Sequence, residues 1–569
     1  MQGAMILMIG TMTVKVVSML FKIPISNLLG GTGYSYFTNA YEIFNLISTI
    51  ATAGFPVAIS KLVSENGVLG NYRDNHKIFR ISRTFFLITG LLCMAVMILG
   101  AGSFAAMIPN PGAKLSICLA PAVLTCCLMS AYRGYYQGMQ NMYPTSISQI
   151  IEAVTKMIFG LGLSGGVMYL TQREYSLHVT VLGRSYPSPE QAQAVIAQLA
   201  SGAAVLGVSL STAAGLVYLM LRWRKKGDGV SQQQLMHAPK PQDSSILLKR
   251  ILVIAIPVCL GSLAVNLSGI IDLLTVTGRL SHVMDTAPQQ LLACYGQNIP
   301  QAELVNGTVH NYLYGAYSGK AVVIANLVPA LTTGMAVSAL PAVAESFAGG
   351  NRLRTQKSIQ MVLRITALFC VPAGLGISAL SQEVCSLFFG MNNEVMIGAP
   401  LLRVLGLASI FIALTGTTNS LLQAVGKVSL PVKLILIGSA IKLAMNYLLV
   451  GIPQLNIQAA PWSTLVCYVV ITLLSLIALR STVGPLGAFG VFGKPLLAGL
   501  LCAAFARLTQ NMLMQVTASR FVVLLSAAVG AAVYLVGLLL LRALKKEDIM
   551  MLPKGEKMAK ILEKYSLLG

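Results

Sequence analysis

The segment from Gly10 to Gly31 reads GTMTVKVVSMLFKIPISNLLGG, and it decides the class of fold to which the chain belongs. Most of it is apolar enough to cross a lipid bilayer, which takes about 20 residues of helix. It nevertheless contains Lys15 and Lys22, although the bilayer interior makes an ammonium group costly. The two lysines lie seven residues apart and therefore share one face of a helix. The segment predicts a membrane span with a cationic face.

The composition of the whole chain agrees with a membrane protein. Of its 569 residues, 55% are hydrophobic and only 10% are charged, which is too little charge to cover a soluble protein of this size. The formal net charge of +22 is spread over short clusters between apolar runs, a pattern that excludes a nucleic-acid-binding patch. The ten cysteines show no metal-binding spacing, so we expect them to be buried apolar side chains.

The apolar runs predict about fourteen spans. They must be helices, because a helix satisfies its own backbone hydrogen bonds within lipid. The N-terminal run contains lysines and lacks a clean cleavage site, so we interpret it as a retained span rather than a signal peptide. The approximate cores of the spans are 4–29, 41–64, 83–107, 114–138, 146–170, 200–221, 251–278, 318–345, 361–380, 400–424, 431–451, 458–479, 490–508 and 521–542.

The charges of the loops alternate along the chain and predict the orientation. Clusters such as Arg222–Lys226 and Arg352–Lys357 fall on one side, whereas the alternate loops hold few cations and most of the loop acids. Loops rich in Lys and Arg stay in the cytoplasm. Both termini are therefore predicted to be cytoplasmic, in agreement with an even number of spans.

A weak internal repeat indicates two lobes. The stretch ATAGFPVAISKLVSE (51–65) resembles AVSALPAVAESFAGG (336–350), and residues 137–156 resemble 423–442. Six spans return the chain to its starting side, so a pseudo-twofold axis along the membrane normal would relate the halves. The predicted fold is an all-α polytopic membrane protein. Its expected parts are an N-terminal six-helix lobe (1–224), a cytoplasmic linker (225–248), a C-terminal six-helix lobe (249–480), two additional helices (481–545) and a basic cytoplasmic tail (546–569).

Five stretches together resemble a known family. The chain is similar to the flippases of the multidrug/oligosaccharidyl-lipid/polysaccharide (MOP) exporter superfamily, in the branch of stage V sporulation protein B and the MurJ-like lipid II flippases. The stretches cover both lobes. They are KVVSMLFKIPISNLLG (15–30), STIATAGFPVAISKLVSE (48–65), LMSAYRGYYQGMQNMYPTSISQIIE (128–152), NLSGIIDLLTV (266–276) and YGAYSGKAVVIANLVPALTTGMAVSALPAVAES (314–346).

The resemblance implies a V-shaped two-lobed fold around a cationic cavity, in a bacterial plasma membrane. It also implies a polyprenyl-diphosphate-linked sugar as substrate, above all lipid II, moved from the inner to the outer leaflet by alternating access. The two helices beyond twelve would form a groove for the lipid tail. We expect a monomer that binds neither nucleic acid nor a cofactor or metal. Transport would be coupled to Na⁺, H⁺ or the membrane potential, since no nucleotide-binding loop is present.

The same resemblance assigns diphosphate binding to Lys15, Lys22 and Lys320, and Arg133, near the cytoplasmic end of the fourth predicted span, is a further candidate for substrate contact. Ammonium and guanidinium groups give charge-assisted hydrogen bonds to phosphate oxygens, with lysine acting as a point charge rather than a fork. Each residue has an alternative. Lys15 could pair with an acid, Lys22 and Lys320 could reach an interface, and Arg133 could hold a helix end in place.

Five further residues are assigned to ion coupling or to a charge network within the membrane: Asp272, Lys442, Asn446, Glu152 and Lys156. Glu152 and Lys156 are spaced i, i+4, which predicts that they neutralise each other. The resemblance makes Asp272 the acid of a coupling-cation site and Asn446 its asparagine. At the repeat-related position Lys442 has no acid one turn earlier, so its ammonium could stand where a sodium ion would bind.

Three other functions compete with a lipid II flippase. An exporter of another polyprenyl-linked oligosaccharide would need the same diphosphate site and is barely distinguishable from the sequence. A drug/cation antiporter of the same superfamily would favour an acidic, aromatic cavity and twelve spans. A membrane-embedded glycosyltransferase would need clustered carboxylates on an outer loop, and the largest such loop, Ser281–Tyr317, offers only widely spaced acids.

Overall fold

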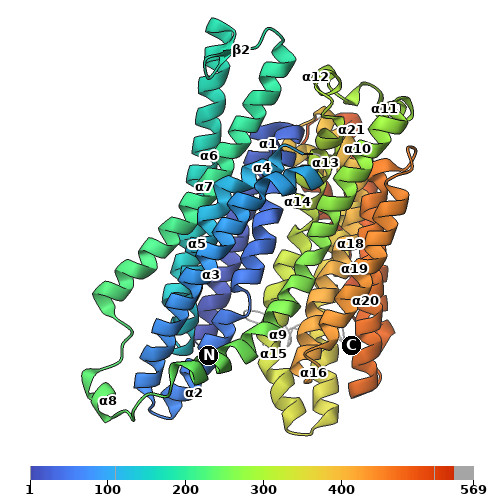
Figure 1. Ribbon diagram of the computed structural model, residues 1–569. Helices are drawn as coiled ribbons and strands as arrows, with labels where there is room; N and C mark the ends of the chain where they lie inside the picture. The colour runs from blue at the N-terminus through green and yellow to red at the C-terminus, as the bar shows by residue number, and fades with distance from the viewer. Residues whose placement is uncertain (1, 109, 518, 544–569) are drawn as a thin grey trace. The chain divides into compact units, whose positions relative to one another are not determined.

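The computed structural model of the chain describes residues 2–108, 110–517 and 519–543. The predicted tail, 546–569, lies outside these residues. The described residues divide into two compact units: the first lies within 2–288 and 299–315, and the second lies within 289–298 and 316–543. Within the described residues, the strands form a single two-stranded antiparallel sheet and helices dominate the remainder, which confirms the predicted all-α polytopic fold (Figure 1).

The first unit is built mainly of long helices. Its elements are α1 (Gln2–Thr52), α2 (Phe55–Val68), α3 (Tyr72–Met107), α4 (Gly112–Leu115), the 3₁₀ turn η1 (Ser116–Leu119), α5 (Ala120–Gly138), α6 (Tyr143–His178), β1 (Thr180–Val181), β2 (Arg184–Ser185), α7 (Pro189–Lys226), α8 (Gln232–His237), α9 (Ser244–Ile271), the π-helical turn η2 (Asp272–Val276), α10 (Thr277–Thr286), α12 (Gln301–Val305) and most of α13 (Val309–Ala316).

Helix α1 contains two predicted spans joined by a bend. Gly30 has φ 65° and ψ 179°, a conformation that interrupts the helical path and that a side chain would strain. The chain continues as helix on both sides of Gly30, where the sequence predicted a loop between 29 and 41. A polar loop was expected because the segment around Gly30–Thr38 is less apolar, but its side chains are largely buried in the unit.

Small residues bring the helices of the first unit into close contact. A β-carbon at Gly134 of α5 would lie 2.9 Å from the Cα of Pro56, and one at Gly138 would lie 2.6 Å from the Cβ of Val63. A β-carbon at Gly160 of α6 would lie 2.6 Å from Cε2 of Phe21 in α1. In lipid, helices associate through such close packing rather than through a hydrophobic effect. These glycines therefore fix how α5 and α6 meet α2 and α1.

Helices α6 and α7 form an arm with the hairpin β1–β2 at its tip (Figure 1). Their 36 and 38 residues would each run for more than 50 Å if straight, roughly 20 Å longer than a bilayer core. The tip is fixed by Glu174, whose carboxylate accepts hydrogen bonds from the hydroxyl of Thr180 and the amides of Leu182 and Gly183. The predicted outer loop between 170 and 200 is therefore a structured extension of both helices.

The predicted linker is docked on the first unit. His76 Nε2 lies 2.6 Å from Oδ2 of Asp228, and the hydroxyl of Tyr135 donates to the same oxygen at 2.6 Å. Further along, the amide of Gln242 donates to Asp74, and Arg73 donates to the carbonyl of Leu235 at the short helix α8. Residues 227–242 therefore follow a defined path along the start of α3 rather than forming a loose tether.

The second unit is again mainly helical. Its elements are most of α11 (Pro288–Tyr295), the 3₁₀ turn η3 (Gly296–Asn298), the π-helical turn η4 (Tyr317–Ala321), α14 (Val322–Ala325), α15 (Leu327–Ala348), α16 (Arg352–Ala379), α17 (Ser381–Phe389), α18 (Asn393–Ala424), α19 (Leu430–Leu449), the 3₁₀ turn η5 (Asn456–Gln458), α20 (Ala459–Val483), the π-helical turn η6 (Phe489–Gly493), α21 (Lys494–Val516) and α22 (Val522–Leu540).

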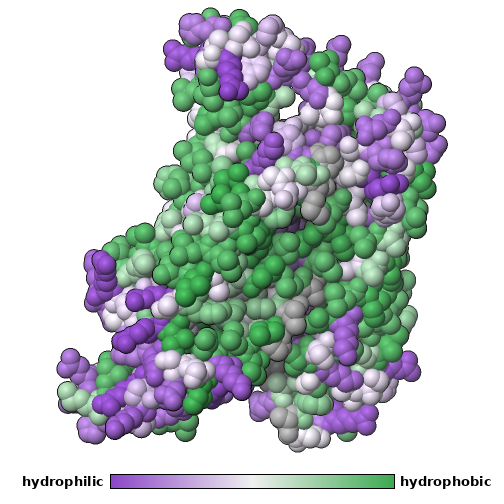
Figure 2. Space-filling view, viewed as in Figure 1, coloured by the Kyte–Doolittle hydropathy of each residue, from purple (hydrophilic) through white to green (hydrophobic). Residues whose placement is uncertain are grey.

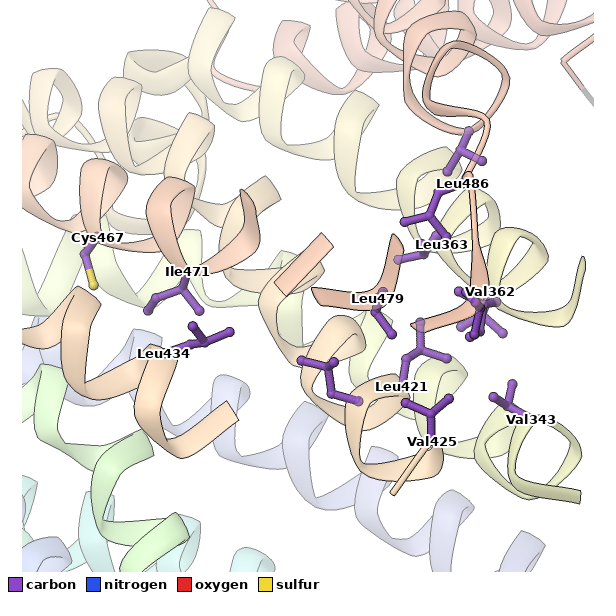
Figure 3. Close-up of a cluster of buried hydrophobic side chains, with 14 residues drawn as sticks. Val343, Val362, Leu363, Leu421, Val425, Leu434, Cys467, Ile471, Leu479 and Leu486 are labelled. Carbon is purple, nitrogen blue, oxygen red and sulfur yellow. The ribbon is translucent and has the colours of Figure 1, made fainter. Parts of the chain in front are cut away.

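A buried aliphatic cluster holds one end of this unit together. Figure 3 shows side chains from α15, α16, α18, α19 and α20, with Leu363 and Leu479 fully buried among them. The two additional helices pack on α16 separately: the hydroxyl of Tyr534 in α22 donates to the carbonyl of Leu368 at 2.9 Å. Hydrophobic side chains cover the middle of the helices and hydrophilic ones gather at their ends, on the face in Figure 2.

Twelve helical runs within the described residues are long and apolar enough to cross a membrane. The first, Gly10–Val68, covers two of the fourteen predicted cores, and the predicted core 318–345 coincides with η4, α14 and α15, outside those runs. The chain is therefore a multi-pass membrane protein. The first unit also contains α9, which packs against α1 and α2.

Candidate functional site

The first unit places five charged side chains on α1, α5 and α6, within the helices rather than at their ends. We call them the charge cluster; its members are Lys22, Glu42, Arg133, Glu152 and Lys156. Four of the five were predicted as site residues. With all five ionised, three cations and two carboxylates leave one net positive charge. Such a group within a membrane helix bundle marks a functional site more often than a structural one.

The bend in α1 brings Lys22 and Glu42 together. Twenty residues separate them, so in a straight helix they would lie about 30 Å apart. In the structure they are close enough for the carboxylate of Glu42 to attract the ammonium group of Lys22. A β-carbon at Gly269 of α9 would lie 3.0 Å from Oε2 of Glu42, which places this carboxylate against α9 as well. The bend at Gly30 is therefore what makes the first part of the cluster.

Arg133 holds Glu152. Its Nη2 lies 2.9 Å from Oε2 of Glu152, and its Nε donates to the hydroxyl of Ser148 at 3.0 Å. Ser148 and Glu152 are one turn apart on α6, so the guanidinium fork spans both of them. The next residue, Gly134, presses α5 against α2, which fixes the base of the arginine. Arg133 is thus an ion-pairing residue inside the unit.

The predicted i, i+4 pair between Glu152 and Lys156 is replaced by this arrangement. The carboxylate attracts the ammonium of Lys156 at longer range, but the described residues show no ion pair between them. The Nζ of Lys156 instead lies 5.6 Å from the ring centroid of Phe21. The spacing rule considers one helix at a time, so it does not include the guanidinium from α5, which forms the close ion pair with Glu152.

Lys15 and Asp272 lie elsewhere in the first unit. Lys15 is partly buried two turns before Lys22 on α1. Asp272 is partly buried at the start of the π-helical turn η2, an irregularity that occurs often at functional sites. The phenol of Tyr314 lies within electrostatic range of both Asp272 and Glu42. Tyr314 therefore lies within electrostatic range of the acid assigned to ion coupling and of the acid that attracts Lys22.

The remaining predicted residues belong to the second unit. Lys442 and Asn446 are buried one turn apart on α19, and the hydroxyl of Ser463 donates to the side-chain oxygen of Asn446. Lys320 is 1% exposed; its Nζ lies 3.0 Å from Oε2 of Glu394 and 4.6 Å from the ring centroid of Phe389. Because a carboxylate compensates it in a buried place, the structure assigns Lys320 an internal ion pair. Diphosphate binding by Lys320 stays a prediction.

Sequence reasoning missed two acids. Glu42 is a lone acid inside the predicted span 41–64, and that isolation was the signal that could have identified it. Glu394 falls between the predicted cores 361–380 and 400–424 and therefore counted among the loop acids, but it lies in the first turn of α18 and its side chain is mostly buried against Lys320. A glycine makes room there, since a β-carbon at Gly398 would lie 3.1 Å from the Cβ of Lys320.

Comparison with known families finds one match in each unit. Residues 1–171 match the family described as polysaccharide biosynthesis protein, and residues 317–448 match the family described as MatE. Lipid II flippase MurJ of Bacillus subtilis (strain 168) is 25% identical over 557 residues, which is 94% of each chain. Stage V sporulation protein B of the same organism is 23% identical over 563 residues, 97% of each chain.

Solved structures agree with these matches. Lipid II flippase MurJ in an inward closed conformation superposes with a TM-score of 0.60 at 14% identity, over 94% of this chain and 98% of that one. An inward-facing MATE family transporter of the MOP superfamily also gives 0.60 at 14% identity, over 84% and 98%. Over nearly its whole length the chain is thus similar in sequence to lipid II flippase MurJ and stage V sporulation protein B, and it shares its fold with MurJ and with MATE transporters of the MOP superfamily.

Proposed function

We propose that this chain is a flippase that moves a polyprenyl-diphosphate-linked sugar, lipid II, from the inner to the outer leaflet. The observation that carries the proposal is the similarity to lipid II flippase MurJ over 94% of both chains. The charge cluster supports it, because a net positive group inside the helices suits an anionic head group that cannot enter hydrocarbon unaided. Lys15 and Lys22 on α1 are the proposed diphosphate ligands.

The loop charges support an orientation with both termini in the cytoplasm of a bacterial cell. The lipid tail would stay in the bilayer while the two additional helices guide it. Coupling to Na⁺, H⁺ or the membrane potential would involve Asp272, which neighbours the cluster through Tyr314. The chain is proposed to work as a monomer.

Complementation tests the proposal. In a bacterium whose own lipid II flippase is depleted, the chain should restore growth and outward lipid II movement, and Lys22→Gln should reduce both at equal membrane abundance. Lys61→Gln is the control, because Lys61 is an exposed lysine on α2 of the same unit. A wild-type chain that reaches the membrane and moves no lipid II would refute the lipid II assignment.

A second candidate is an exporter of another polyprenyl-linked oligosaccharide. The match of residues 1–171 to polysaccharide biosynthesis proteins favours it specifically. The two functions separate in a reconstituted vesicle assay with lipid II and with a polyprenyl diphosphate that has a different glycan. Transport of the second lipid without the first would identify the exporter.

A further inference from the structure

We infer that Lys156 of α6 is a second ammonium ligand for the diphosphate, acting beside Lys22 of α1. This inference rests on the proposed function and adds to it a residue that the sequence had assigned to an internal pair. The structure supports it in three ways: the pairing of Glu152, the approach of α6 to α1, and the charge that remains.

The first argument is that Glu152 is already engaged. Its carboxylate lies 2.9 Å from Nη2 of Arg133, and the same guanidinium is oriented by Ser148 one turn earlier. A carboxylate held by a guanidinium has little capacity left to neutralise an ammonium group beyond contact distance. Lys156 is therefore left without a dedicated counterion on its own helix.

The second argument is the packing of α6 against α1. Gly160 lets the ring of Phe21 approach the backbone of α6, and one turn away on α6 the ammonium of Lys156 lies 5.6 Å from that ring. Lys22 directly follows Phe21, and the two ammonium groups are close enough to repel each other. Neither side chain is fully buried within the described structure.

The third argument is charge. Arg133 and Glu152 cancel, which leaves Lys22, Lys156 and the single carboxylate of Glu42. Neither lysine donates a hydrogen bond or forms an ion pair within the described residues. The carboxylates that attract them, Glu42 for Lys22 and Glu152 for Lys156, act at longer range. Two like charges close together in a poorly solvated place oppose each other, and an anion between them removes that cost. A diphosphate, with two phosphoryl groups, can offer one to each ammonium group, whereas a monophosphate has a single phosphoryl group to share between them.

Binding of two lipids tests the inference. The full chain in nanodiscs is titrated with undecaprenyl diphosphate and, separately, with undecaprenyl phosphate. Lys156→Gln should weaken diphosphate binding by about tenfold, roughly 1.4 kcal/mol, and monophosphate binding by much less. Lys156→Arg should keep most of the preference, since it keeps the charge, and Lys61→Gln should change neither affinity. Thermal unfolding of each variant identifies any loss that comes from misfolding.

The outcomes separate this inference from the proposed function. Diphosphate binding by Lys156→Gln equal to wild type, with Lys22→Gln impaired, would overturn the role of Lys156 and leave the flippase intact. Equal weakening of the binding of both lipids would also overturn it, because a structural defect would lower both affinities whatever the number of phosphates. A wild-type chain that binds neither lipid would contradict the proposed function itself.

Discussion

Glu152 has two cations nearby, and the one from another helix holds it. An arginine fork that spans Glu152 and Ser148 aligns α5 with α6 and leaves Lys156 pointing toward α1. Arg133 is therefore a positioning residue, and its loss would affect the whole charge cluster.

Replacing Arg133 tests this view. Arg133→Gln should lower the free energy of unfolding by about 1–3 kcal/mol, because a partly buried carboxylate loses its partner. Arg133→Lys should recover only part of it, since an ammonium cannot span two acceptors. Thermal unfolding in detergent measures both. Full stability of Arg133→Gln would show that the carboxylate finds another partner, and Lys156 would be the first to examine.

The pair of Lys320 and Glu394 gives a sharper prediction, because Lys320 is 1% exposed. Glu394→Gln should destabilise the protein by about 3 kcal/mol, since it leaves a buried charge uncompensated. The double variant Lys320→Met with Glu394→Gln should recover much of this loss. A Glu394→Gln protein with unchanged stability but impaired transport would instead support the original diphosphate assignment of Lys320.

The residues of the site could be predicted in part. Lys22, Arg133, Glu152 and Lys156 were identified because charge inside an apolar run is rare. Their partners were not, because partners come from neighbouring helices and periodicity describes one helix at a time. Glu42 shows the limit: its role depends on the bend at Gly30, which no local pattern of charge contains.

At the scale of elements, the bend in α1 controls which charges meet. Gly30→Ala should cost about 1–3 kcal/mol, because φ 65° with ψ 179° is a region that only glycine occupies easily. It should also impair transport by shifting Glu42 relative to Lys22. Gly67→Ala, at a place with open space around the β-carbon, is the matched control. Equal behaviour of the two variants in stability and transport would mean that the bend is dispensable.

The docked linker predicts a response to acid. Asp228 is partly buried, which by itself raises its pKa, but hydrogen bonds from His76, Tyr135 and the amide of Val230 outweigh burial and lower it from 3.8 to about 2. Because the pKa of Asp228 is lower when the linker is docked, the ionised carboxylate stabilises docking at pH values above the pKa that the group has in the undocked linker. The contribution is lost as the pH falls from about 4 toward 2.

Mobility of the linker measures this effect. A spin label at Gln233→Cys, in a Cys294→Ser background that removes an exposed thiol, should be immobile at neutral pH and become mobile between about pH 4 and 2. Asp228→Asn should make it mobile already at neutral pH. A label that stays immobile in Asp228→Asn would show that the contacts of Arg73 and Asp74 suffice.

At the scale of the whole molecule, the fold was more predictable than the site. The number of spans and their approximate cores follow from apolar length, which the bilayer imposes on every helix separately. Lengths beyond the bilayer were not predicted, because the ends of α6 and α7 are polar and read as loops. The docking of the linker was not predicted either, because its contacts are with side chains distant in sequence.

The orientation can be tested with single cysteines. In intact cells, a membrane-impermeant maleimide should label Ser185→Cys at the tip of the arm and leave Gln233→Cys in the linker unlabelled until the cells are permeabilised, in the same Cys294→Ser background. Labelling in the opposite sense would invert the predicted topology and place both termini outside the cytoplasm.

The arm also has a practical consequence. A transporter of 60.3 kDa offers little mass beyond a detergent micelle for aligning particle images. Gly183 sits at the turn of the hairpin with open space around it, and both of its flanking helices run unbroken into the bundle. A short epitope grafted at this turn would let an antibody fragment serve as a rigid fiducial, so the protein could be imaged by electron cryomicroscopy during its transport cycle.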